Sequence, residues 1–114
     1  MSECIFCRIV HREIPAKIIF EDESTVAFED IRPEAPQHFL VVPKEHLESL
    51  AKISDDHEPL LGHLLSVAAK LARERGLEPN GYRTVVNTGA GAGQTVFHLH
   101  VHVLGGRTFH WPPG

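Results

Sequence analysis

Apolar and polar residues alternate most regularly near the end of the chain, in the segment His98-Leu99-His100-Val101-His102-Val103-Leu104. A period of two is that of a β-strand, whose successive side chains point to opposite faces. The apolar residues at positions 99, 101 and 103 are therefore expected in a core, and the three histidines on the other surface. Neutral imidazole can act as a nucleophile or a general base near pH 7, so three on one face suggest chemistry.

Weaker patterns predict the remaining elements. Leucine and alanine recur at the spacing of one helix face over residues 59–75, and Gly76 follows as a stop. Runs rich in β-formers, bounded by turn residues, predict strands at 17–21, 25–29, 38–42 and 82–87. A short turn or helix is expected around 46–53. Grouped strands with one long helix predict an α+β domain with a five-stranded antiparallel sheet.

Length and charge narrow the class of protein. A chain of 114 residues is expected to form a single domain over residues 1–114. Eleven basic and 15 acidic residues give a net charge of −4 without a basic run, which argues against polymeric nucleic acid as a partner. The start, Met1-Ser2-Glu3-Cys4, shows neither a basic leader nor an apolar stretch. We therefore expect a soluble, cytoplasmic protein without a membrane span.

The histidine row has two interpretations beyond an ordinary exposed strand. His-x-His on a strand supplies two metal ligands in several unrelated folds. At about 3.3 Å per residue, however, the outer two histidines lie about 13 Å apart, too far to share one ion with bonds near 2.1 Å. A phosphate or nucleotide lying along the row explains the whole motif better.

The two cysteines, Cys4 and Cys7, form a Cys-x-x-Cys pair. A structural disulfide is not expected in a reducing compartment, and the strand–Cys-x-x-Cys–helix setting of a redox pair is not visible. The pair is then half of a zinc site that needs two more ligands, or two small residues packed in a terminal turn. The residues alone do not choose between these two.

Candidate ligand-binding groups surround the row. The segment Gly89-Ala90-Gly91-Ala92-Gly93-Gln94-Thr95 can turn its amides toward an anion, although a hairpin connection has the same composition. The Thr95 hydroxyl and the Asn87 amide can converge on the same oxyanion. His38 is either a partner of the row or a polar strand end, and Asp30 either a ribose ligand or a turn residue.

The motif His-φ-His-φ-His-φ-φ, with φ apolar, resembles the signature of the histidine triad (HIT) superfamily. Residues 13–17, 28–33, 38–43, 105–107 and 110–114 resemble its branch of small histidine triad nucleotide-binding proteins, so the resemblance spans essentially the full length. It implies an α+β homodimer that binds purine nucleoside monophosphates. It also implies hydrolysis of nucleoside 5′-phosphoramidates without a catalytic cofactor.

The resemblance implies roles for individual residues. His100 would attack the α-phosphorus and form a nucleotidyl-histidine intermediate that water then cleaves. His102 would contact the phosphate and assist the leaving amine. His98 completes the catalytic row, and His38 would support the row from the neighbouring strand. The other implied contacts are Asn87, Gly93, Gln94 and Thr95 to phosphate, Asp30 to ribose, Ile31 to the base, and His110 and Trp111 to the partner subunit's site.

Some bacterial members of the superfamily bind structural zinc through Cys-x-x-Cys, a histidine after the third strand and the first triad histidine. Those positions are Cys4, Cys7, His46 and His98 in this chain. The resemblance thus implies a structural zinc ion, although many close relatives lack the cysteines and fold without metal.

Two other functions stay open at this point. One is a dinucleoside polyphosphate hydrolase or a nucleotidyl transferase of the same superfamily. Such transferases typically carry glutamine at the third triad position, whereas this chain has His102. Against the polyphosphate hydrolase stands the ending with Trp111, which resembles the small nucleotide-binding branch. The other is a nucleotide-binding or partner-binding protein whose turnover is incidental.

Overall fold

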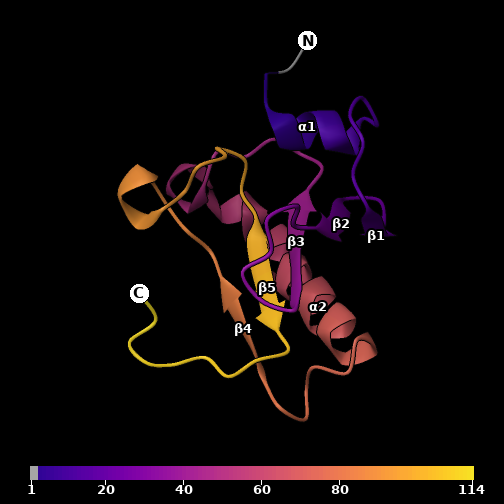
Figure 1. The fold of residues 1–114 in the computed structure, drawn as a ribbon. Helices are drawn as coiled ribbons and strands as arrows, with labels where there is room; N and C mark the ends of the chain where they lie inside the picture. The colour runs from indigo at the N-terminus through magenta and orange to yellow at the C-terminus, as the bar shows by residue number, and fades with distance from the viewer. Residues whose placement is uncertain (1–2) are drawn as a thin grey trace.

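The computed structural model describes residues 3–114; Met1 and Ser2 of the expected leaderless start lie outside them. Five antiparallel strands form one sheet in the order β1-β2-β3-β5-β4 (Figure 1). The strands are β1 (Ile18–Glu21), β2 (Thr25–Glu29), β3 (Gln37–Pro43), β4 (Tyr82–Val85) and β5 (Val101–Gly105). The helices are α1 (Ile5–Val10) and α2 (Glu58–Glu74). Short 3-10 turns are η1 (Leu50–Lys52), η2 (Asp55–His57) and η3 (Ala90–Ala92). The predicted α+β fold is confirmed.

The long helix α2 has clear signals at both ends. Pro59 lies in its first turn, where the missing N–H would have had no helical partner. Gly76 follows the C-cap residue Arg75, and its φ of 72° is left-handed. The N–H of Leu77 donates to the Ala72 carbonyl and that of Gly76 to the Arg73 carbonyl, both at 3.0 Å, which is a Schellman motif. The helix predicted over 59–75 is therefore confirmed to within one residue at each end.

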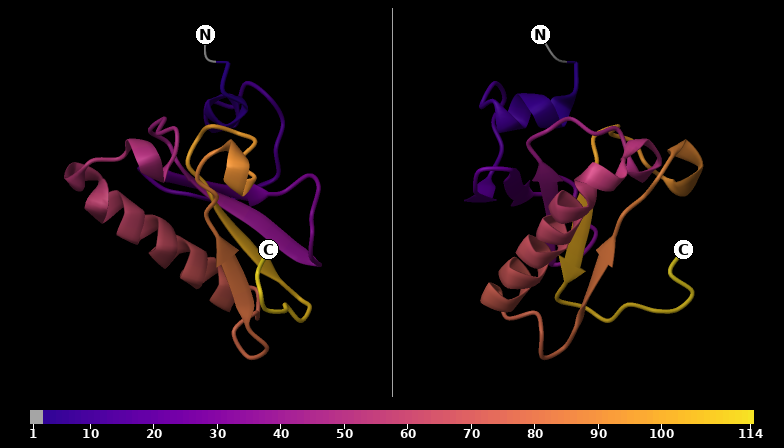
Figure 2. Two further views of the ribbon diagram at one scale, coloured as in Figure 1. Left: turned by 90° about the vertical axis from the view of Figure 1, so that its left-hand side faces the viewer. Right: turned by 180° about the vertical axis from the view of Figure 1, so that it is seen from behind.

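The two helices cover opposite faces of the sheet (Figure 2). One core joins α2 to the side chains of Ala27, Phe39, Val41, Leu99, Val101 and Val103. The other joins Phe6 and Ile9 of α1 to Val26, Phe28, Leu40 and Val42. The apolar residues of the histidine segment enter the α2 core, as their alternation predicts. The histidine face lies on the α1 side, so it is covered rather than open to water.

The predicted bounds of two strands need correction. Strand β5 begins at Val101, so His98 and His100 precede it, because the N–H of Leu99 donates to the Leu47 carbonyl instead of a neighbouring strand. Strand β4 ends at Val85, which pairs with His102, since β5 offers it little partner backbone beyond that point.

The first element predicted from the sequence is the strand at 17–21, but the structure has the helix α1 before it. This helix has six residues, too short for its periodicity to stand out, and the Cys4 sulfur accepts the Cys7 N–H at its start. Its stability comes from buried Phe6, Cys7 and Ile9.

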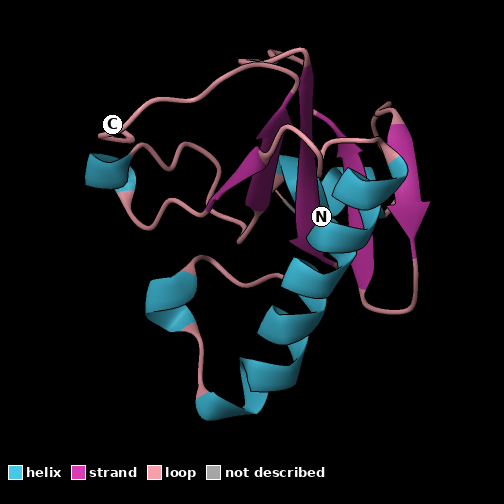
Figure 3. Ribbon diagram, turned by 90° about the horizontal axis from the view of Figure 1, so that it is seen from below, coloured by secondary structure: helices cyan, strands magenta, loops and turns pink. Residues whose placement is uncertain are grey.

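After β5 the chain runs out on the side of β4 without a further helix or strand (Figure 3). Among the described residues, no helix is both long enough and apolar enough to cross a membrane.

Candidate functional site

His100 and His102 line a cavity of about 280 Å³ on the α1 side of the sheet. Its wall is mostly apolar, with Asp30 and Thr95 among the polar groups. The apolar wall includes Ile5, Phe6, Ile9, Phe28, Ile31 and Leu40. A mostly apolar cavity with a few polar groups in its wall has the form of a small-molecule site.

The ring of His100 is held by its Nδ1. This nitrogen lies 2.7 Å from the backbone carbonyl oxygen of His98, so we assign its proton to Nδ1, which donates to that oxygen. The Phe6 ring packs edge-to-face on the imidazole at 5.1 Å between centroids. Burial lowers the pKa of His100, against the opposing effects of the His98 carbonyl and the Asp30 charge. The neutral ring therefore keeps a lone pair on Nε2.

His102 is held in the opposite tautomer. The backbone N–H of Glu34 donates to His38 Nδ1 at 3.0 Å, which leaves the His38 proton on Nε2. His38 Nε2 lies 3.0 Å from His102 Nδ1 and 3.4 Å from Asp30 Oδ2. His102 therefore accepts at Nδ1 and carries its own proton on Nε2. Burial, together with His100 and His38, lowers the pKa of His102 to about 4.

Two adjacent imidazoles thus offer complementary chemistry. The rings of His100 and His102 stand 4.9 Å apart between centroids, one with a lone pair on Nε2 and one with a proton there. A nucleophile and a proton donor side by side can attack a phosphorus centre and protonate its leaving group.

Asp30, His38 and His102 also bring three potential metal-ligating atoms within 4.8 Å of one another. The Glu34 amide argues against a metal ion there. Because it occupies His38 Nδ1, the Nε2 that faces the other two groups holds a proton instead of a lone pair. The cluster is a chain of hydrogen bonds.

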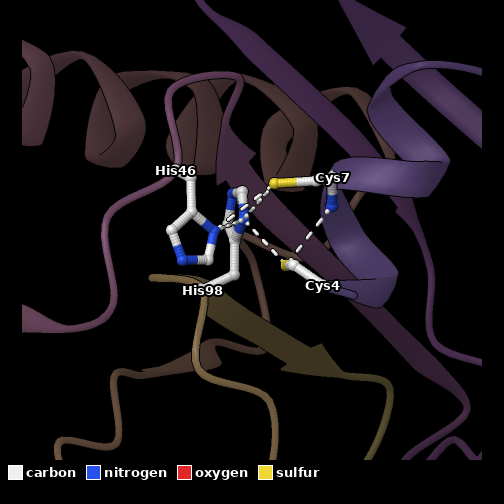
Figure 4. A group of neighbouring side chains, drawn as sticks. All are labelled: Cys4, Cys7, His46 and His98. Atoms are coloured by element: carbon white, nitrogen blue, oxygen red, sulfur yellow. Dashed lines mark hydrogen bonds between the residues drawn. The ribbon is translucent and has the colours of Figure 1, made fainter. Parts of the chain in front are cut away.

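A second cluster joins Cys4, Cys7, His46 and His98, whose side chains converge (Figure 4). His98 Nδ1 lies 3.3 Å from Cys4 Sγ, 3.5 Å from Cys7 Sγ and 3.2 Å from His46 Nδ1. Cys7 Sγ lies 3.4 Å from His46 Nδ1. A tetrahedral zinc site with nitrogen and sulfur bonds of about 2.0–2.3 Å has ligand-to-ligand distances of about 3.3–3.8 Å.

The tautomer of His98 also suits a metal. Its Nε2 lies 2.8 Å from the Pro43 carbonyl and donates to it, so the lone pair is on Nδ1, toward the cysteines. Burial lowers the pKa of His98 to about 4, which keeps the ring neutral. The donor set and its spacing therefore fit a closed, four-coordinate zinc site.

The three histidines expected on one face divide between the two clusters. His98 is fully buried and its ring belongs to the Cys/His cluster, while His100 and His102 face the cavity. His98 meets the cavity chemistry through its backbone carbonyl, which holds His100.

The glycine-rich loop is braced by Gln94. Its side-chain oxygen accepts the Gly89 N–H at 2.8 Å, and its Nε2 donates to the carbonyls of Glu48 and Val96. The Gln94 side chain is buried, and its backbone N–H also donates to Gly89. These bonds hold the loop that leads to the histidines.

The other predicted phosphate ligands take different positions. Thr95 lines the cavity, but Asn87 and Gly93 do not, and the Gly93 N–H closes η3 by donating to Ala90. Asp30 and Ile31 both line the cavity, with Ile31 87% exposed.

The sequence pattern did not reveal that α1 forms part of the cavity wall. Ile5, Phe6 and Ile9 recur at the spacing of one helix face directly after Cys4, a signal that six residues make weak. At the other end, Trp111 is 82% exposed, and the His110 carbonyl accepts from Arg83 of β4.

Comparison with known proteins identifies the family to which this chain belongs. A family model described as "Scavenger mRNA decapping enzyme C-term binding" matches residues 3–109. An uncharacterized HIT-like protein of Synechococcus elongatus is 52% identical over 115 residues, with both chains covered completely. The chain belongs to the HIT family.

HIT relatives with solved structures share its fold. A structure called a HIT family hydrolase, from Legionella pneumophila, superposes with a TM-score of 0.96 at 49% identity, covering 98% of this chain and 100% of that one. A histidine triad nucleotide-binding protein from Candida albicans gives a TM-score of 0.82 at 36% identity over 96% and 83% of the two chains. A relative from Zea mays, 49% identical over 99% of this chain and 89% of its own, is called a 14 kDa zinc-binding protein.

Proposed function

We propose that this HIT protein hydrolyses purine nucleoside 5′-phosphoramidates, such as adenosine 5′-monophosphoramidates. The observation that carries the proposal is the pair of opposite tautomers at His100 and His102. Support for the broader class comes from the Legionella relative called a hydrolase and the Candida relative called nucleotide-binding.

In the first step, His100 Nε2 attacks the α-phosphorus and the P–N bond breaks. The departing nitrogen takes the proton from His102 Nε2, because an amine leaves far more readily when it is protonated. The His102 ring is then anionic, and its charge is balanced by the His100 ring, which becomes cationic on forming the bond to phosphorus while it keeps its Nδ1 proton. As His102 loses that proton, the hydrogen bond that His38 Nε2–H donates to His102 Nδ1 becomes stronger. The products are a free amine and a nucleotidyl group on His100.

In the second step, water attacks the same phosphorus. His102 Nε2, now unprotonated, takes a proton from the water, and the bond between phosphorus and His100 breaks. The nucleoside monophosphate is released, and both rings return to their starting tautomers.

Nucleotide binding is assigned to the groups around the cavity. Asp30 binds the ribose hydroxyls, Ile31 covers one face of the base, and Thr95 donates to a phosphate oxygen. Asn87 and Gly93 remain proposed phosphate contacts beyond the cavity wall. For Gln94 the bonds to the loop favour a bracing role, through which it places Thr95.

We also propose that Cys4, Cys7, His46 and His98 hold one zinc ion, as the name of the Zea mays relative suggests for that protein. Bound there, the ion would supply structural cross-linking and no chemistry on the substrate. It would tie α1, which forms part of the cavity wall, to the segments before β5 and after β3.

A homodimer is the proposed assembly. Strand β4 is an edge of the sheet, and beside it lies an apolar cavity lined by Leu50, Leu61, Leu65 and Val86, among others. His110 and Trp111, in the exposed tail, are the proposed contacts to the partner's site in such a dimer. Light scattering on the purified protein tests this: a monomer at micromolar concentration would contradict it.

The function is tested by brief exposure of the protein to an adenosine 5′-phosphoramidate, followed by mass spectrometry without acid. Fragmentation must locate any adduct among the three histidines of the 98–102 segment. A nucleotidyl group on His100 is the expected result. Nucleotide release without an adduct, even in His102→Ala, would mean direct attack by water. Binding of the phosphoramidate without any release would indicate a nucleotide-binding protein. Release of nucleotide from a dinucleoside polyphosphate, but not from the phosphoramidate, would indicate a dinucleoside polyphosphate hydrolase.

A further inference from the structure

Arg75, at the C-terminal end of α2, joins two strands on the face opposite the cavity. Its Nη2 donates to Glu29 Oε2 of β2, and its Nη1 donates to Gln37 Oε1 of β3, each at 2.7 Å. The guanidinium carbon lies 5.3 Å from the centroid of the Phe39 ring. The side chains of Arg75 and Glu29 are 26% and 25% exposed. One half-buried guanidinium therefore ties the end of β2 to the start of β3.

The residues that follow Glu29 and Gln37 belong to the hydrogen-bonded cluster of Asp30, His38 and His102. Asp30 follows Glu29, and His38 follows Gln37, so each pair places its side chains on opposite faces of the sheet. Asp30 and His38 contact each other on the cavity side, and the Asp30 N–H donates to the His38 carbonyl at 3.0 Å. Arg75 thus binds, on the face opposite the cavity, the two backbone segments that contain Asp30 and His38.

The chemistry of the cluster depends on that placement. The bond of 3.0 Å between His38 Nε2 and His102 Nδ1 decides which nitrogen of His102 carries the proton. Charge-assisted bonds to a planar guanidinium are among the stronger and more directional hydrogen bonds, and two of them fix the strand ends relative to each other.

We propose that Arg75 is a positioning residue for Asp30, His38 and His102. It acts through Glu29 and Gln37, and it sets how well His102 donates a proton to the leaving group. The inference rests on the proposed hydrolase function of that cluster.

The test compares three variants. Arg75→Met keeps an unbranched stem over Phe39 but removes both donors, and Arg75→Lys keeps the charge without the fork. Arg73→Met is the matched control: Arg73 lies on the same helix and pairs at 3.3 Å with Glu78, where both side chains are about half exposed or more (62% and 48%).

Two adenosine phosphoramidates serve as substrates, one with an alkylamine and one with an arylamine leaving group. An alkylamine needs the proton more, so Arg75→Met should lower its kcat by about 10-fold and that of the arylamine compound by much less. Arg75→Lys should fall between, and Arg73→Met should match the wild type. Equal losses on both substrates, or none, would overturn the proposal, because a general loss of structure does not distinguish leaving groups.

A measurement without substrate separates this inference from the proposed function. Imidazole ¹⁵N shifts should report His102 protonated on Nε2 in the wild type and a mixture of tautomers in Arg75→Met. Unchanged shifts in a folded variant would overturn the role of Arg75 even if turnover falls. If the wild type hydrolyses neither substrate, the proposed function fails while the shifts still decide about Arg75. Should Arg75→Met not fold, Gln37→Leu removes one of the same two bonds and carries the same expectations.

Discussion

His100 donates its Nδ1 proton to the backbone carbonyl oxygen of His98 across 2.7 Å. The bond fixes both the direction of the ring and the position of its lone pair, since Nε2 is left without a proton. His98 in turn donates from the other nitrogen, Nε2, to Pro43. Two histidines two residues apart therefore present opposite nitrogens, one to the cavity and one to the Cys/His cluster.

Replacing His100 should remove the reaction but not the binding. His100→Ala is expected to lower phosphoramidate turnover to the uncatalysed rate, because it removes the Nε2 lone pair that forms the proposed bond to phosphorus. Affinity for adenosine monophosphate, measured by titration calorimetry, should stay within a few-fold. A nearly normal rate in this variant would exclude His100 as the nucleophile.

His102→Ala should slow the first step by a factor on the order of 10²–10⁴, the range usual for a lost general acid or base. Single-turnover kinetics would measure the rate of amine release directly. Alkylamine substrates should suffer more than arylamine ones, since they depend more on protonation. Equal rates in the variant and the wild type would rule out His102 as the acid.

Protein purified without added metal should contain close to one zinc ion per chain by elemental analysis, as a closed site with four protein ligands requires. Cys4→Ser is expected to lose the ion and to unfold at a lower temperature. His57→Ala is the matched control, because His57 lies outside the Cys/His cluster. Metal-free protein of normal stability would reject the zinc site.

Acid should destabilise the fold through the cavity histidines. The pKa of His102 is about 4 in the folded protein against 6.5 for the exposed side chain, so between these values the unfolded chain binds a proton that the folded chain excludes. Stability should therefore fall as pH drops from about 6.5 toward about 4. Chemical denaturation across this window should give a shallower decline for His102→Gln, and identical curves would contradict the burial argument.

Two glycines of the long-helix region should respond to alanine with opposite signs. Gly62 is exposed within α2 with open space where a Cβ would lie, so Gly62→Ala should stabilise by about 0.5–1 kcal/mol. Gly76 has a φ of 72°, so Gly76→Ala should destabilise by about 1–2 kcal/mol. Urea denaturation of both variants checks the pair, and a shift of the same sign in both would contradict the conformational explanation.

The local spacing of apolar and polar residues predicted much of the secondary structure and of the core. The alternation around Val101 places the right residues in the α2 core, and Gly76 ends the helix that the leucine spacing predicts. These signals work because strand and helix periods are local properties of the backbone.

Contacts between segments that are far apart in the sequence could not be predicted from such local spacing. The Gln94 amide resembles a phosphate ligand in sequence, but its acceptors include the Glu48 carbonyl, 46 residues away. Arg75 meets Glu29 across the same separation of 46 residues and reads in sequence as an ordinary charged residue at a helix end. Only the packing of α2 on the sheet reveals it.

The bond from His100 to residue 98 uses the main chain, whereas the Cys/His cluster uses the side chain of the same residue. Every amino acid at position 98 would offer the same carbonyl oxygen. A lineage could therefore gain or lose the proposed zinc ligands by substitution without disturbing the orientation of His100. The proposed reactivity and the proposed metal binding are therefore separable traits, although they share one residue.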